Sequence, residues 1–240
     1  NDKKDARLTF IHDQLAELNK ELKGKNSRLH TFYSTPKEAF TSLLKDYSLQ
    51  KVVANEDYEP YATKRDQEIQ SFLNEEGIEL EMHKDQVIFD PNEVLKDDDT
   101  PYLVYTPYSK KWLSLLKEDH LEGYSSALYF DNWKEEEFQE IHSLEEMGFN
   151  KSNIVVPRPV VSDHTLNVYA EQRDFPAKDI TSRIGVHLRF GTVSVREIAK
   201  QAKGKSEVFL KELIWREFFM TILFHYPRVI NSNFNKRYDG

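Results

Sequence analysis

The sequence contains no cysteine, which excludes disulfide bonds and any metal site built on thiolates. No stretch approaches the roughly 18 consecutive apolar residues of a membrane-spanning helix. The first ten residues, NDKKDARLTF, also lack the apolar run of a signal peptide. These absences fit the reducing cytoplasm, so we predict a cytoplasmic protein with no membrane partner.

The familiar signatures of catalysis and nucleotide binding are absent as well. The sequence has no G-x-x-x-x-G-K-[S/T], no G-x-G-x-x-G and no G-x-S-x-G. Its eight histidines show no H-x-x-x-H spacing, so we expect no metal site. Any chemistry must therefore come from another set of residues.

The composition supports a folded protein with an uneven distribution of charge. Hydrophobic residues make up 39% of the 240 positions, enough for one large domain or two modest ones. The net charge is −8, but the residues from Arg158 onward contain 14 Lys and Arg against 9 Asp and Glu. This asymmetry favours an acidic front module and a back module that faces an anion. A chance difference between two solvated surfaces is the alternative.

The first 100 residues alternate helix and strand signals. The segment TPKE (residues 35–38) is a capping box, and Gly24 is a stop signal after a helical pattern. Such alternation indicates a parallel sheet with crossover helices. The chain opens on a helix and shows only three or four strands, so we expect a sheet that lacks its first strands. Strands are expected at residues 28–34, 51–55, 78–83 and 86–90, and helices at 11–22, 36–47 and 62–74.

Helical signals dominate the last third of the chain. The segment SVRE (residues 194–197) is a second capping box, and residues 209–227 read as a long helix. An acidic and then proline-punctuated stretch precedes them. We therefore predict an α/β domain over residues 1–128, an interdomain linker over 129–162 and the start of an all-helical domain over 163–240.

The predicted long helix, FLKELIWREFFMTILFHYP, is apolar on nearly every face yet carries charges in its middle. Phe209, Glu212 and Arg216 share one face, flanked by Trp215 and Phe219. Such a face suits the floor of a pocket for a phosphate or a planar ligand. A structural ion pair between Glu212 and Arg216 is the alternative.

Two other parts of this region bear on charge. Glu217 is expected to form an ion pair with a neighbouring basic residue. The segment TSRIG (residues 181–185) places two hydroxyls and an arginine at a predicted helix start, which favours an anion, with an ordinary cap as the alternative.

Several motifs in this order resemble one known family. YAEQRDFPAKDITSRIGVHLRFGTVSVREI followed by FLKELIWREFF is similar to the start of the flavin-binding helical domain of the DNA photolyase/cryptochrome family. NEDYEPYATKRDQEI and SLEEMGF resemble its α/β antenna domain and linker. The chain therefore resembles an internal fragment of a class I cyclobutane pyrimidine dimer photolyase. It lacks the family's opening strand–FRRDLR–helix–strand unit and ends before the later flavin-binding residues.

The resemblance implies FAD as the cofactor. Gly185 stands where the family more often has Ser, and Phe209 where it often has Trp. The implied FAD-binding residues are Tyr169, Thr181, Ser182, Arg183, Ile184, Gly185, Phe209 and Arg216.

The resemblance also implies damaged DNA as the partner and a deoxyribodipyrimidine photo-lyase, a carbon–carbon lyase driven by blue light. Glu212 and Trp215 are the implied catalytic and DNA-binding contacts to a flipped dimer, and Arg173 the implied contact to the DNA backbone. No metal is required. We expect a monomer without an obligate protein partner.

Several points stay open at this stage. The antenna chromophore is a folate, a deazaflavin, a flavin or absent, and Tyr61 and Ala62 stand where a folate would need a polar pair. A cryptochrome-type photoreceptor and a protein without flavin are the alternative functions. Cyclobutane and (6-4) lesions are not distinguished. The isolated 240-residue chain is expected to bind FAD poorly and to be inactive alone.

Overall fold

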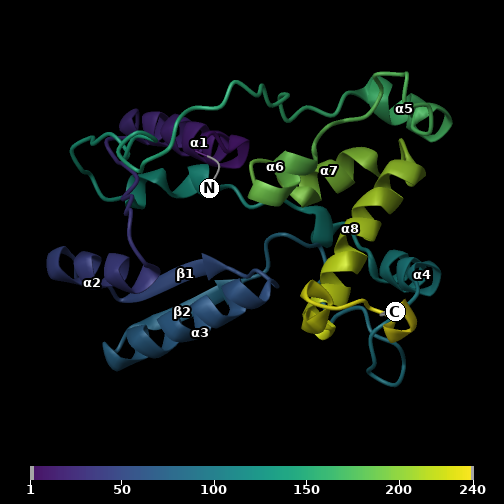
Figure 1. Ribbon diagram of the computed structural model, residues 1–240, viewed down its shortest axis with the longest axis horizontal. Coiled ribbons are helices and arrows are strands. Elements are labelled where there is room, and N and C mark those ends of the chain that lie inside the picture. The colour runs from purple at the N-terminus through teal and green to yellow at the C-terminus, as the bar shows by residue number, and fades with distance from the viewer. Residues whose placement is uncertain (1–2, 239–240) are drawn as a thin grey trace. The chain divides into compact units, whose positions relative to one another are not determined.

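The predicted capping boxes open helices in the computed structural model, which describes residues 3–238 (Figure 1). Helix α2 (Pro36–Asp46) follows Thr35, whose backbone N–H donates to the Glu38 carboxylate at 2.8 Å. Helix α7 (Val195–Ala202) follows Ser194, whose hydroxyl oxygen accepts the N–H of Glu197 at 3.4 Å. Both predicted helix starts are confirmed.

The sheet is small and parallel. Strand β1 (Lys51–Asn55) pairs with β2 (Glu79–His83), and α3 (Pro60–Glu75) is the crossover between them. Figure 1 shows α3 running alongside the two strands. A parallel sheet with a crossover helix, followed by a helical region, confirms the predicted α/β fold class and two of its strands.

Two predicted strands are wrong. Residues 28–34 and 86–90 are irregular, and in each range side chains accept hydrogen bonds from backbone N–H groups. The N–H of Leu29 donates to the Asn19 side chain at 2.8 Å. The N–H groups of Ile88 and Phe89 donate to a carboxylate on a distant helix, at 2.7 and 3.1 Å.

The chain forms two compact units that do not follow sequence order. One unit runs up to Asp46 and resumes over Tyr124–Arg158, and it contains α1 (Ala6–Lys23) and α2. The other comprises Tyr47–Gly123 and the described residues from Pro159 onward. The predicted functional domains, with boundaries at residues 128 and 162, stay a prediction.

The second unit contains the main hydrophobic core, built around the long helix α8 (Glu207–His225). Helix α8 contacts α4 (Tyr105–Leu115), α5 (Asp163–Gln172) and α7. Helix α6 (Gly185–Phe190) contributes Leu188 to the same core. Within residues 3–238, none of the helices combines the length and apolar character needed to cross a membrane. Short 3₁₀ helices lie at Asp119–Leu121, Ser126–Asn132, Pro227–Ile230 and Lys236–Tyr238.

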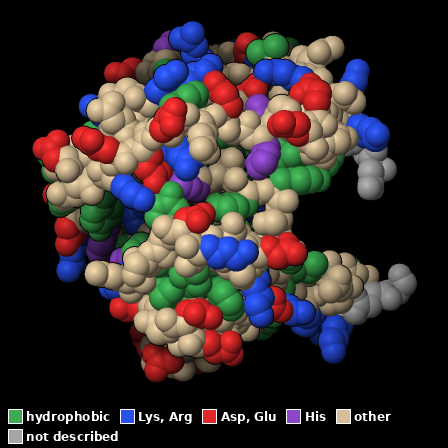
Figure 2. Space-filling model, turned by 90° about the vertical axis from the view of Figure 1, so that its left-hand side faces the viewer, with side chains coloured by type: hydrophobic (Ala, Val, Ile, Leu, Met, Phe, Trp, Pro, Cys, Tyr) green, Lys and Arg blue, Asp and Glu red, His purple; other side chains and the backbone are tan. Residues whose placement is uncertain are grey.

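The charged side chains on the outside are of mixed sign. Figure 2 shows Lys and Arg interspersed with Asp and Glu over the face that it draws, with hydrophobic side chains between them. The charge asymmetry of the sequence therefore does not produce a surface of one sign on this face.

Glu217 of α8 is the most unusual buried residue of this core, with 2% of its surface exposed. Its carboxylate accepts the N–H groups of Ile88 and Phe89 and the indole N–H of Trp112, the last at 2.5 Å. The prediction of an ion pair is therefore wrong, because N–H donors from two other segments satisfy this carboxylate. Burial nevertheless raises the pKa of Glu217 from 4.5 to about 7, against the opposing effect of these donors and of Arg216.

This pKa predicts a pH-dependent stability. Because the folded state holds the proton more tightly than the unfolded chain, the contribution of Glu217 is complete below about pH 4.5 and is lost as the pH rises through about 7. Over this pH window the free energy of unfolding should fall by an amount on the order of 3 kcal/mol. We expect Glu217→Gln to abolish this slope in urea unfolding and, at about pH 5, to lower the free energy of unfolding by about 1–3 kcal/mol, since the amide leaves one N–H donor without an acceptor.

A matched control is Glu207→Gln, at an exposed position of the same helix that pairs with Lys211. This variant should keep the pH profile of the unchanged chain between pH 5 and 8. A Glu217→Gln variant with the original slope would show that another group titrates.

Candidate functional site

An open hollow of about 580 Å³ lies beside the N-terminal half of α8, within the second unit. Helix α5 supplies one wall, the segment that follows it a second, and α8 the floor. The lining residues are Tyr169, Arg173, Asp174, Thr181, Glu212, Trp215 and Phe219. The structure thus brings together five of the predicted site residues, namely Tyr169, Arg173, Thr181, Glu212 and Trp215.

Aromatic rings form one side of the hollow. Trp215 stacks on Tyr105 with ring centroids 3.6 Å apart and planes 7° from parallel. The Phe219 ring lies 5.5 Å from Trp215 on the same helix, and 61% of its surface is exposed. The hydroxyl of Tyr105 donates to the Lys211 carbonyl at 2.8 Å, which fixes its ring under the indole. The result is a flat apolar surface of the kind on which a base stacks.

An ion pair between Arg173 and Glu212 lies across the hollow. The Arg173 guanidinium donates to the Glu212 carboxylate, and this contact raises the pKa of Arg173. Arg173 also lies 5.8 Å from the centre of the Tyr169 ring. The alternative of an ion pair between Glu212 and Arg216 is therefore wrong, because Glu212 turns toward α5.

Arg216 points away from the hollow into the core. Its guanidinium donates to the backbone carbonyls of Gln86 at 2.6 Å and of Leu188 at 3.0 Å. Burial lowers the pKa of Arg216. The side chain thus has a structural role, and its predicted contact with a cofactor stays a prediction.

Tyr169 and Phe209 meet edge to face, with centroids 4.9 Å apart and an angle of 72°. Phe209 is buried, whereas Tyr169 is half-buried and faces the hollow. Burial, with a smaller effect from Glu212, raises the pKa of Tyr169, so this phenol stays protonated. Phe209 thus supports Tyr169 from behind.

The segment 181–185 joins the hollow to helix α6. The hydroxyls of Thr181 and Ser182 form no hydrogen bond to any residue in the described range 3–238. Arg183 adopts a left-handed backbone with φ of 51° and pairs with Asp179 at 2.5 Å. Ile184 is buried in the core, and a Cβ built on Gly185 would have no atom within 4 Å.

Tyr105 was missed by sequence reasoning. It lies 110 positions before Trp215, in a segment where tyrosines recur without a functional pattern. Only the packing of α4 against α8 brings the two rings together. No local signal in the sequence reports this contact.

The position of Arg216 leads to a prediction about stability. Arg216→Ala leaves two partly buried carbonyls without their donor, so we expect a loss of about 2–4 kcal/mol in urea unfolding. The control Arg183→Ala removes an exposed ion pair and should cost less than about 1 kcal/mol. Unchanged stability in Arg216→Ala, together with lost FAD in the full-length protein, would instead favour the cofactor contact.

The family model described as DNA photolyase matches residues 1–125. Deoxyribodipyrimidine photo-lyase of Halobacterium salinarum is 27% identical over 251 aligned positions, which cover 95% of this chain and 52% of that protein. The chain spans about half the length of the photo-lyase relatives that it matches.

Two solved structures share the fold. A bacterial class III photolyase from Agrobacterium tumefaciens matches with a TM-score of 0.79 and 21% identity, over 100% of this chain and 54% of that one. An archaeal photolyase from Sulfolobus tokodaii, solved with two FAD molecules, matches with a TM-score of 0.67 and 23% identity, over 99% and 53%. At these identities the likeness concerns the fold.

Proposed function

The chain belongs to the DNA photolyase family, and we propose that the full-length protein uses light to split pyrimidine dimers in DNA by electron transfer from reduced FAD. The observation that carries this proposal is the hollow that combines the Trp215 surface with Glu212, Arg173, Tyr169 and Thr181. We propose further that the protein is a cytoplasmic monomer. Its deoxyribodipyrimidine photo-lyase relatives support the reaction class.

The donors around the hollow fit part of a flavin nucleotide. The free hydroxyls of Thr181 and Ser182 suit its phosphate and ribityl oxygens, and Arg183 adds a positive charge beside them. Tyr169 offers a phenol and a ring face backed by Phe209. When bound, reduced FAD supplies the electron that light makes available. Thr181, Ser182 and Tyr169 would hold and orient the nucleotide beside α8.

Substrate recognition is assigned to the other lining residues. Trp215, held flat by Tyr105, gives a flipped pyrimidine an apolar surface on which to stack. Glu212 offers carboxylate oxygens to the N–H edge of a base, and the guanidinium of Arg173 donates to the same carboxylate. Arg173 is half-buried, and its guanidinium has enough N–H groups to donate both to Glu212 and to a DNA phosphate.

We also propose an antenna chromophore, without committing to a folate, a deazaflavin or a flavin. At the position where a folate would need two polar groups, Ala62 is buried and Tyr61 is exposed on α3. This arrangement gives no support to a folate.

The stacking role of Trp215 predicts a selective loss of binding. Trp215→Ala in the full-length protein should weaken binding of dimer-containing DNA by about 5- to 150-fold, the equivalent of 1–3 kcal/mol of stacking. Binding of undamaged duplex should change little. Fluorescence anisotropy with matched damaged and undamaged oligonucleotides measures both. Unchanged affinity for the damaged strand would contradict the proposal and favour a photoreceptor without repair.

Arg173→Ala serves as the contrasting variant. Loss of one phosphate contact should weaken damaged and undamaged DNA alike, and lower the slope of log K against log salt by about 0.9. The two variants thereby separate recognition of the lesion from attraction to the backbone.

A further inference from the structure

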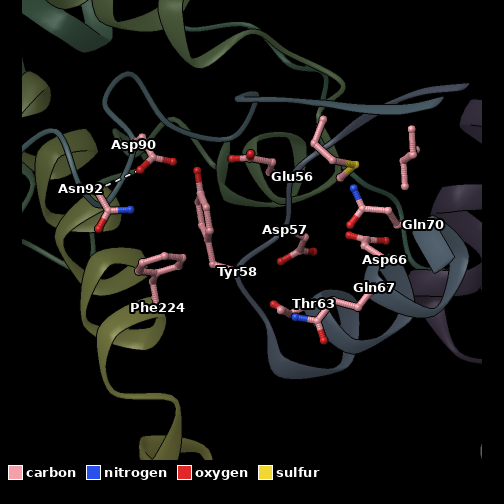
Figure 3. A pocket seen from close by; sticks show the side chains of 12 residues that line it. Glu56, Asp57, Tyr58, Thr63, Asp66, Gln67, Gln70, Asp90, Asn92 and Phe224 are labelled. Carbon is pink, nitrogen blue, oxygen red and sulfur yellow. Dashed lines mark hydrogen bonds between the residues drawn. The ribbon is translucent and has the colours of Figure 1, made fainter. Parts of the chain in front are cut away.

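A second pocket, of about 320 Å³, lies where β1 ends and α3 begins, within the second unit. Figure 3 shows side chains of α3 and of the segment between β1 and α3 lining it, together with Phe224 of α8. Four of the lining residues are acidic: Glu56, Asp57, Asp66 and Asp90. None of them belongs to the hollow described above.

Cations of the chain compensate only some of this charge. Asp66 accepts from the neighbouring Arg65 at 2.7 Å, and Asp57 lies 3.8 Å from Arg189. Within residues 3–238, Glu56 and Asp90 form no ion pair. Burial, and then the charge of Asp90, raises the pKa of Glu56, while Lys84 and His83 act in the opposite direction. The ammonium group of Lys84 pairs with Glu93 at 2.5 Å and not with either of these carboxylates. One part of the pocket therefore has an excess of negative charge.

A buried hydroxyl without a partner lies in the same part of the pocket. Tyr58 is 8% exposed, and its hydroxyl has no hydrogen-bond partner among the described residues. Figure 3 shows the hydroxyl end of Tyr58 directed to the side where Glu56 and Asp90 lie. Its ring is fixed edge to face against Phe224, with centroids 5.7 Å apart. Buried polar groups are nearly always paired, so this hydroxyl is an independent sign that a ligand belongs here.

The lining residues narrow the class of ligand. No group of three or more His, Asp or Glu within the described residues is arranged to hold a metal ion, which argues against a metal ion as the ligand. A folate or a flavin nucleotide carries negative charge and would be repelled, so the pocket does not suit those antenna chromophores. Leu80, Met82 and Phe224 add apolar surface to the lining of the pocket. Methylene groups pack on such surface while ammonium groups reach carboxylates.

We propose that this pocket binds a small aliphatic diamine or polyamine, with an ammonium group between Glu56 and Asp90 and its methylene groups against Leu80, Met82 and Phe224. An ammonium group donates three hydrogen bonds, enough for both carboxylates and for the oxygen of Tyr58. The site is independent of the proposed repair reaction.

Isothermal titration calorimetry of the full-length protein with putrescine and spermidine tests the proposal. We expect saturable binding of one amine per chain, weakened about tenfold by Glu56→Gln through the lost charge-assisted hydrogen bond. Tyr58→Phe should also weaken binding severalfold. It should not lower the unfolding temperature, because the hydroxyl that it removes has no partner in the protein.

The matched control is Glu68→Gln, which removes the same charge from an exposed position of α3 that lies outside the pocket. Its affinity should stay within about twofold of the unchanged protein. Equal weakening by Glu56→Gln and Glu68→Gln would show attraction to net charge alone and overturn the proposal. Absence of saturable binding in the millimolar range, or equal binding of the uncharged 1,4-butanediol, would overturn it as well.

Discussion

The second unit depends on the buried carboxylate of Glu217, which accepts its hydrogen bonds from uncharged N–H groups and not from a cation. Glu217 collects one indole and two backbone N–H groups from Trp112 on α4 and from Ile88 and Phe89, and so ties both segments to α8. An unpaired buried charge would cost several kcal/mol, so these donors must be in place for the core to close. Their placement explains why residues 86–90 are irregular rather than a strand.

This anchor also orients the candidate site. Successive residues of an α-helix are turned by 100°, so Trp215 and Phe219, each two positions from Glu217, face the opposite side of α8. Glu212 is turned away from Glu217 by about 140°. When Glu217 faces the core, these three residues therefore face the hollow. The helix is apolar on nearly every side because one face fills a core and another carries the aromatic side of the hollow.

Local signals in the sequence predicted local structure well. Each capping box predicts a helix start from two residues that lie three positions apart. Both starts were confirmed, at Thr35 with Glu38 and at Ser194 with Glu197. The paired strands 51–55 and 79–83 were also found. The N–H of Leu29 is taken up by Asn19, only ten positions away, whereas the other failures have a non-local cause. Glu217 finds its donors 105 to 129 positions away, and Arg216 finds the Gln86 carbonyl 130 positions away.

The same distinction holds for the site. Motifs within residues 169–219 named most of the residues that line the hollow, because α5 and α8 lie close in sequence. Tyr105 could not be predicted from the sequence, because it is in no motif and contacts Trp215 only through the packing of α4. The pairing of Glu212 with Arg173 rather than Arg216 depends on the approach of α5 to α8, which the helical pattern alone does not contain.

We propose that the hollow beside α8 belongs to a light-driven repair enzyme. The most direct measurement follows cyclobutane dimers in an oligonucleotide incubated with the full-length, FAD-loaded protein under blue light and in darkness. We predict that the dimers revert to intact pyrimidines in the light and persist in the dark. Dimers that persist under illumination, with FAD bound and reduced, would contradict the account.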